Sequence, residues 1–247
     1  MARAASGGGD PARTLALLWD LDPPSPRGPR QRLRPAQVGD AAVALADAQG
    51  LDAVTVRAVA AQLGVAPMTL YTYVPGRDEL LDLMVDLVHR EELPALRGGW
   101  RERAEQVARE RLDRARRHPW LLEVATRRRP PLGPGTIGTY ERELVALDGA
   151  GLSDVERDLV VVLLGDVADG AARGGTAAGA QDADWWAASG PLLERVLDPA
   201  RYPRAVRVGA AAGAEQGAAY DPGRALAFAL DRVLDGVAAL VAGRPPA

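Results

Sequence analysis

The chain has 247 residues, of which 47% are hydrophobic, and its 30 basic side chains, all of them Arg, are outnumbered by 33 acidic ones. The formal charge of −3 excludes a general polyanion binder, so any contact with DNA has to come from a local surface. Cysteine is absent, which excludes disulfides, thiolate metal sites and a cysteine nucleophile. No stretch approaches the roughly 18 to 20 apolar residues of a membrane span, and the first ten residues lack a signal-peptide core, so we expect a cytoplasmic protein.

Composition favours helix. Alanine, leucine and valine dominate, whereas aromatic residues make up only 4% of the chain. Alanine and leucine are good helix formers, and the residues typical of strands are scarce. The sequence therefore predicts an all-α fold.

Residues 1–34 form a leader with a glycine run at 7–9 and a proline-rich segment at 22–30, neither of which suits regular structure. Between them, the apolar patch Thr14 to Trp19 predicts a single turn of helix that docks on the protein. Two interpretations of the leader stay open: a disordered segment, or an arm that reaches DNA phosphates or the minor groove. The second rests on its arginines, which are Arg3, Arg13, Arg27, Arg30, Arg32 and Arg34.

The rest of the chain shows helical periodicity and helix-capping signals. Pro35 and Thr55 suit helix starts, Gly50 and Gly64 suit helix ends, and Ser153 to Glu156 is a capping-box pattern. Asp221 followed by proline marks another start. Residues 174–181, rich in Gly and Ala, are predicted to form a loop. The predicted helices cover residues 35–49, 55–63, 66–73, 77–88, 100–117, 119–126, 135–150, 153–170, 184–197 and 222–241.

Residues 51–81 hold the most informative pattern, a helix, a tight turn at Gly64 and a second, short helix. Leu63, Val65 and Leu70 would form the small core that fixes the crossing angle. This geometry projects the second helix outward, where it can enter a DNA major groove about 12 Å wide. Hydroxyl groups in this segment can bind phosphate oxygens without net positive charge; they belong to Thr69, Tyr71, Thr72 and Tyr73.

This block strongly resembles the tetracycline-repressor family. The resemblance rests on the runs Ala-Ala-Gln-Leu-Gly-Val at 60–65, Thr-Leu-Tyr-Thr-Tyr-Val at 69–74 and Asp-Glu-Leu-Leu at 78–81, and it covers about residues 35–90. It continues more weakly through residues 118–122, 140–141 and the apolar helix after Ser153, which look like the C-terminal domain of the tetracycline-repressor subgroup. The family implies a three-helix DNA-binding domain at 35–80 and a larger helical domain at 81–247.

The resemblance also implies roles for single residues. Tyr71 and Tyr73 become phosphate contacts, Arg77 a phosphate clamp, and Thr55 a helix cap and backbone contact. The candidates for reading bases are Arg57, Pro67, Met68, Thr69 and Thr72. Only Arg57 can make a bidentate contact with guanine, worth about 1–3 kcal/mol in discrimination. The alternatives are half-buried packing for the two tyrosines, a solvated charge for Arg57 and a non-contacting side chain for Met68.

In this family the larger domain holds a ligand pocket, which is expected to be mainly apolar with a few polar groups. The candidate lining residues are Met84, Leu87, Trp100, Trp120, Tyr140, Leu144, Trp185 and Trp186. Each tryptophan has plain core packing as its alternative. Arg127 to Arg129 could meet an anionic ligand but better fit a solvated loop. The only histidines, His89 and His118, lie at different helix ends, so we expect no metal and no cofactor.

The predicted helices at 153–170 and 222–241 are apolar over more of their circumference than a surface helix should be. This predicts that they form a four-helix interface in a two-fold homodimer. The alternative is burial within one subunit. A two-fold dimer predicts a palindromic operator with half-sites about 34–36 Å apart. The expected interface residues are Leu159, Val162, Leu163, Val167, Phe228, Leu230, Val233, Leu234, Val237 and Leu240.

The family implies a ligand-responsive repressor that is released from DNA by a small apolar or aromatic effector, through a shift between two states. Two alternatives stay open: a regulator of this fold without a ligand, and an activator. The sequence offers no catalytic equipment, since it has no cysteine, two separated histidines, no phosphate-binding glycine loop and no zinc spacing. We therefore expect no enzyme.

Overall fold

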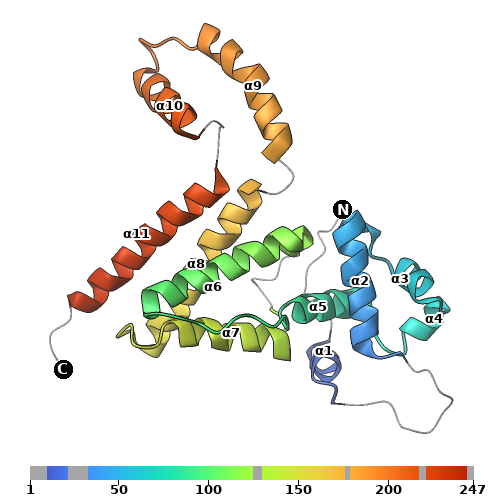
Figure 1. Ribbon diagram of the computed structural model, residues 1–247. Coiled ribbons are helices and arrows are strands. Elements are labelled where there is room, and N and C mark those ends of the chain that lie inside the picture. Colours follow the sequence, from blue (N-terminus) through green and yellow to red (C-terminus); the bar gives the residue numbers. More distant parts are fainter. Residues whose placement is uncertain (1–9, 22–32, 125–129, 176–178, 217–220, 244–247) are drawn as a thin grey trace. The chain divides into compact units, whose positions relative to one another are not determined.

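The computed structural model describes residues 10–21, 33–124, 130–175, 179–216 and 221–243, and within these ranges every regular element is helical (Figure 1). The predicted all-α fold is confirmed. The first half contains α1 (Pro11–Leu18), α2 (Pro35–Gln49), η1 (Leu51–Ala53), α3 (Val56–Leu63), α4 (Pro67–Leu70), α5 (Arg77–Val88) and α6 (Trp100–Arg117). The second half contains η2 (Pro119–Leu122), α7 (Pro134–Ala146), α8 (Asp154–Gly175), α9 (Gly179–Val196), α10 (Pro203–Gln216) and α11 (Pro222–Ala242).

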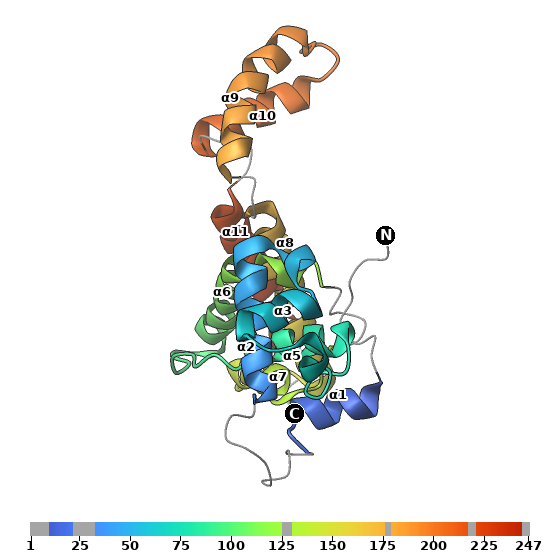
Figure 2. The same ribbon diagram turned by 90° about the vertical axis from the view of Figure 1, so that its right-hand side faces the viewer.

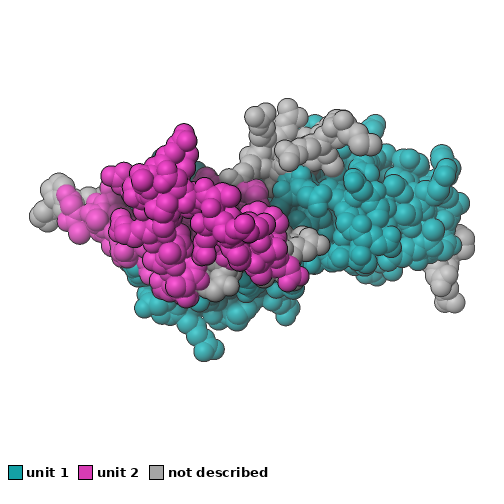
Figure 3. Space-filling model, turned by 90° about the horizontal axis from the view of Figure 1, so that it is seen from above, with its two compact units in different colours: residues 1–161 teal, residues 162–247 magenta. Residues whose placement is uncertain are grey.

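The chain divides into two compact units, residues 1–161 and 162–247 (Figure 3), and the division falls within α8. The expected domain boundary at residue 80 lies inside α5, which continues without a break to Val88. No described helix combines the length and the apolar sequence that a membrane span requires.

Helix starts follow the predicted caps. The Thr55 hydroxyl accepts the amide of Ala58 at 3.1 Å, and the Asp221 carboxylate accepts two amides in the first turn of α11. Ser153 and Glu156 form the predicted reciprocal capping box at the start of α8. Gly64 ends α3 in the left-handed conformation, with φ 67° and ψ 29°.

The core of the first unit lies where α2 packs against α3 and α5. Its largest fully buried side chain is that of Trp120, and Leu80, Leu81, Leu83 and Met84 of α5 surround the same interior. The predicted docked turn at 14–19 is confirmed as α1, which packs on α5 and contributes Leu18 to this core (Figure 2). Leader residues 1–9 and 22–32, which include Arg3, Arg27, Arg30 and Arg32, lie outside the described residues.

The second unit contains an element that the sequence did not predict, since α10 occupies a segment to which no helix was assigned. The helix expected at 184–197 begins earlier, at Gly179, and continues through Pro191. The loop expected at 174–181 therefore shrinks, because α8 reaches Gly175 and only residues 176–178 stay outside the described chain. The helix expected at 119–126 is a 3₁₀ segment that ends at Leu122.

Candidate DNA-binding and effector sites

The pair α3 and α4 forms the helix-turn-helix. The turn closes through the Val65 amide, which donates to the Ala60 carbonyl at 3.0 Å. Leu70 and Val74 point into the core, whereas Met68 is 76% exposed and Tyr71 is 48% exposed. The short helix therefore separates an apolar inner face from an outer face that carries the predicted contact residues.

The predicted base-reading residues are all exposed. Arg57, in the first turn of α3, is exposed, as are Pro67, Met68, Thr69 and Thr72. The Thr72 hydroxyl donates to the Thr69 carbonyl at 2.7 Å, so in this structure its hydrogen is already used. Thr72 is left with its oxygen as an acceptor, and Thr69 and Arg57 are the better hydrogen-bond donors toward DNA.

Two other residues predicted to contact DNA phosphates, Tyr73 and Arg77, also interact within the protein. Tyr73 is half-buried and packs against the core, which is the alternative considered for it, while Tyr71 stands at the surface. The Arg77 guanidinium donates to the carbonyl of Val54 at 2.9 Å and to that of Leu51 at 3.4 Å. Arg77 thus ties the start of α5 to the segment before α3, and only its remaining N–H groups are left for a phosphate.

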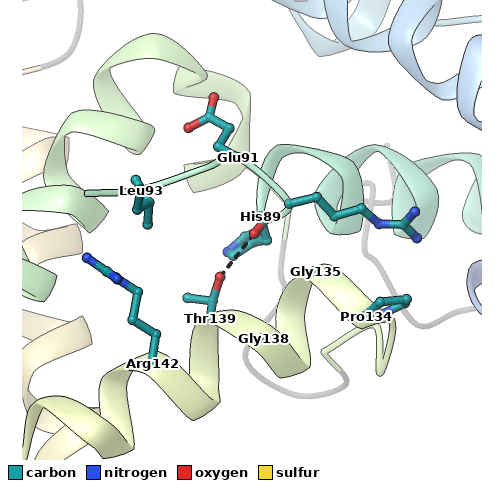
Figure 4. Close-up of a pocket in the computed structure, with 9 residues that line it drawn as sticks. His89, Glu91, Leu93, Pro134, Gly135, Gly138, Thr139 and Arg142 are labelled. Atoms are coloured by element: carbon teal, nitrogen blue, oxygen red, sulfur yellow. Dashed lines mark hydrogen bonds between the residues drawn. The ribbon is translucent and has the colours of Figure 1, made fainter. Parts of the chain in front are cut away.

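A cavity of about 410 Å³ lies between the end of α5, the segment that follows it, and α7 (Figure 4). Its size suits a small organic molecule. Its lining combines apolar surface with polar groups, and it consists of His89, Arg90, Glu91, Leu93, Pro134, Gly135, Gly138, Thr139 and Arg142.

The polar side chains of this cavity are held in place by neighbours. His89 Nδ1 lies 2.7 Å from the Val85 carbonyl, and because a carbonyl only accepts, this nitrogen carries the proton. The Thr139 hydroxyl donates to the His89 carbonyl at 3.3 Å (Figure 4). Arg142 makes a two-pronged ion pair with Glu110 of α6, at 2.9 and 2.7 Å, and also donates to the Pro94 carbonyl.

The wall between α5 and α7 is built on Asp86, whose side chain is fully buried. One carboxylate oxygen accepts two N–H groups of Arg90, and the other accepts the Thr136 amide at 2.9 Å in the first turn of α7. A carboxylate of one helix therefore caps the start of another. Gly133 and Gly135 permit this approach, since a Cβ on Gly135 would lie 2.0 Å from the Asp86 carbonyl oxygen.

None of the eight residues expected to line a pocket lines this cavity. Trp120 is 1% exposed, and its indole N–H donates to Asp47 of α2 at 2.7 Å, which fits core packing, the alternative considered for it. Met84 is fully buried in the same core, and Leu87 packs against it. Trp100 and Leu144 are half-buried elsewhere in the first unit.

The other expected lining residues have different surroundings. Tyr140 donates to Asp158 at 2.8 Å, and this hydrogen bond raises the pKa of its phenol. Trp185 and Trp186 lie in the second unit, on α9, where Trp185 is 61% exposed. The signal that could have located the cavity is the pair of glycines at 133 and 135, which allows α5 and the start of α7 to approach closely. Arg127 to Arg129 lie outside the described residues.

The two histidines, His89 and His118, lie in different parts of the first unit. His118 Nδ1 lies 2.8 Å from the same Asp47 oxygen that accepts the Trp120 N–H, while His89 lines the cavity. Within the described residues, neither belongs to a group of three or more side chains arranged to bind a metal ion.

The residues expected at a dimer interface divide into two groups. Leu159, Val162, Leu163, Phe228 and Leu240 are exposed, and Val167 and Val233 are half-buried. Leu230, Leu234 and Val237 are buried, at 2%, 0% and 5% exposure, which fits the alternative of burial within one subunit. The inner face of α11 belongs to the protein's own core.

Two family models match the chain. Residues 39–84 match "Bacterial regulatory proteins, tetR family", and residues 93–241 match "Tetracyclin repressor-like, C-terminal domain". The HTH-type transcriptional repressor DrrR1 of Streptomyces coeruleorubidus is 44% identical over 97% of this chain and 90% of its own length. The chain belongs to the TetR family of transcriptional regulators.

Solved structures agree with this assignment. Apo ActR from Streptomyces coelicolor has a TM-score of 0.70 and 27% identity, covering 87% of this chain and 99% of its own. ActR in complex with actinorhodin has a TM-score of 0.68 and 27% identity, covering 87% of this chain and 100% of its own. The TetR-family models and relatives describe regulators, not enzymes, in agreement with the sequence analysis.

Proposed function

We propose that this TetR-family regulator represses transcription by binding a palindromic operator as a homodimer, and that a small molecule in the α5–α7 cavity releases it. The observation that carries the DNA-binding part is the outer face of α3 and α4. There Arg57, Thr69 and Tyr71 stand exposed over a buried apolar interior, on a helix-turn-helix whose turn is fixed by Gly64. The relation to a repressor at 44% identity supports repression over activation.

Exposed apolar side chains on α8 and α11 support the homodimer. Val155, Leu159, Val162 and Leu163 recur at helical spacing along α8, and each is more than 40% exposed. Phe228 and Leu240 on α11 are exposed in the same way. Large apolar side chains gathered on one helix face are typical of a subunit interface.

A titration tests the DNA-binding part. The wild type, Arg57→Ala and Tyr71→Phe are titrated against a palindromic duplex from the gene's own upstream region, at several salt concentrations. Tyr71→Phe should weaken binding about tenfold for every sequence, because it removes one hydrogen bond to a charged phosphate. Arg57→Ala should also relax base preference at one position, by about 1–3 kcal/mol.

A control variant makes this titration decisive. Arg207→Ala, on the exposed surface of α10, removes the same charge far along the chain from α3 and should leave both affinity and base preference unchanged. The DNA-binding proposal fails if Arg57→Ala and Arg207→Ala behave alike, or if the wild type prefers no sequence at moderate salt.

The cavity's chemistry suggests the class of effector. Leu93, Pro134 and the glycines of α7 supply apolar contact, while His89, Thr139 and Arg142 supply hydrogen-bonding groups. This lining fits an aromatic molecule with several polar substituents better than the purely apolar alternative. ActR, which shares the fold, has been solved with actinorhodin and with (S)-DNPA, so both serve as probes.

Gly138 offers a direct test of the cavity. A Cβ at Gly138 meets nothing within 4 Å, so Gly138→Leu should fill the cavity without disturbing α7. We expect calorimetry to show actinorhodin binding to the wild type and at least a tenfold loss in Gly138→Leu, with unchanged DNA affinity. Gly209→Leu on α10, where the space is also open, is the matched control. Equal binding by both variants would place the effector elsewhere.

A further inference from the structure

The leader helix α1 contacts both walls of the cavity. The Leu18 carbonyl accepts an N–H of Arg90 at 3.0 Å, and the Trp19 indole N–H donates to the Leu132 carbonyl at 2.7 Å. Arg90 follows α5, and Leu132 lies just before α7. Helix α1 therefore bridges the two elements between which the cavity lies.

These bonds end on groups that shape the cavity. Arg90 lines it directly, and it also lines a smaller hollow of about 260 Å³ together with Leu17, Leu18 and Asp20 of the leader. Pro134 and Gly135, two and three residues beyond Leu132, line the cavity on the α7 side. The leader thus contacts both walls. It bonds directly to Arg90 on the α5 side, and on the α7 side it bonds to Leu132, two residues before the lining residue Pro134.

The Arg90 guanidinium carries the connection further. Its Nη2 donates both to the Leu18 carbonyl and to Asp86, and Asp86 in turn accepts the Thr136 amide of α7. Asp86 is fully buried, so its end of this chain of bonds is shielded from solvent, whereas the Arg90 side chain is 37% exposed. The Leu18 carbonyl connects α1 to this chain of bonds.

Helix α1 has the structural means to stay docked. Asp10 caps its first turn, with the Ala12 amide at 2.9 Å, and Pro11 follows at the first helical position. Thr14 and Leu18 are buried, and Leu18 joins the core that α2 and α5 share. Apolar burial therefore anchors α1, and its two long-range hydrogen bonds fix the orientation in which it docks.

We propose that Leu18 and Trp19 are positioning residues for the effector cavity, and that α1 sets the spacing between Arg90 and the start of α7. Effector recognition by this regulator then depends on the leader, which lies outside the matched helix-turn-helix region at 39–84. The inference rests on the proposed role of the cavity, but its test requires neither DNA nor an effector.

Amide hydrogen exchange in the full-length protein tests the proposal, with Trp19→Phe and Leu18→Ala compared with wild type. Trp19→Phe removes the hydrogen bond to the Leu132 carbonyl and leaves a smaller aromatic ring in place, so exchange should rise about fivefold at residues 131–139. Leu18→Ala removes the buried anchor, so exchange should rise at both 131–139 and 86–92. Exchange in α3, and the melting temperature of Trp19→Phe, should stay at wild-type values.

Two controls separate positioning from general destabilisation. Leu15→Ala shortens a 37% exposed leucine on the same helix, and Trp185→Phe changes an exposed tryptophan on α9. Both should leave residues 86–92 and 131–139 unchanged. The proposal is overturned if Trp19→Phe and Leu18→Ala leave those segments as protected as in wild type, or if protection falls equally in α3. If the wild type binds no operator or no effector, that result would instead count against the proposed function.

Discussion

Asp47 shows how one side chain joins two parts of the fold. One carboxylate oxygen accepts the Trp120 indole N–H at 2.7 Å and lies 2.8 Å from His118 Nδ1. Asp47 lies in α2, within the region that matches the family's DNA-binding model, whereas His118 and Trp120 lie in the region that matches the C-terminal model. Asp47 therefore links the region that matches the DNA-binding model to the region that matches the C-terminal model.

Replacing this acceptor should be costly. In Asp47→Ala the buried Trp120 N–H loses its partner, so the free energy of unfolding should fall by about 1–3 kcal/mol, measured by urea denaturation. Asp40→Ala, on the exposed side of the same helix, should change stability by less than about 0.5 kcal/mol. Equal losses in the two variants would show that the Trp120 contact carries no special weight.

Two glycines of α7 should respond in opposite directions to the same change. A Cβ on Gly135 would meet the Asp86 backbone, which cannot move aside as a flexible side chain can, so Gly135→Ala should destabilise the protein by about 1–3 kcal/mol. A Cβ on Gly138 meets open space, so Gly138→Ala should stabilise it by up to about 1 kcal/mol. Thermal unfolding of both variants checks this, and melting shifts of the same sign would contradict the close approach of α5 and α7.

At the scale of elements, sequence patterns located helices where apolar spacing and caps agreed. Thr55, Gly64 and Asp221 fixed boundaries because each satisfies backbone groups at a helix end. Helix α10 was missed because Gly209 and Gly213 interrupt a segment in which most side chains are exposed, so burial leaves no apolar stripe.

The cavity was predicted less well than the helix-turn-helix, for a physical reason. The expected lining was built on large aromatic residues, but Trp120 fills the core instead of an open space. The residues that do line the cavity, such as His89 and Thr139, lie at a helix end or on a helix facing another element. Periodicity within one segment does not show which two segments will face each other.

The exposed face of α8 gives a prediction for the same scale. Leu159→Arg places a charge on a 60% exposed leucine of the proposed interface and should convert the dimer to a monomer in sedimentation velocity. Val208→Arg makes a matched change at a 57% exposed valine on α10 and should leave the dimer intact. A monomeric wild type, or a dimeric Leu159→Arg, would contradict this assignment.

For the whole molecule, DNA binding has to depend on a local surface, since the net charge is −3. Specific binding to a palindromic operator then requires two DNA-binding domains held in one dimer, and a single DNA-binding domain should bind weakly. In the proposed mechanism, an effector favours a state in which the two DNA-binding domains no longer match the operator.

The most direct test of this account is selection of bound duplexes from a random pool by the full-length protein, followed by titration of the enriched sequence with measurement of stoichiometry. We expect a two-fold symmetric sequence, two protomers per duplex, and loss of enrichment when Arg57→Ala or Leu159→Arg replaces the wild type. Enrichment of no sequence, or of an asymmetric site filled by one protomer, would contradict it.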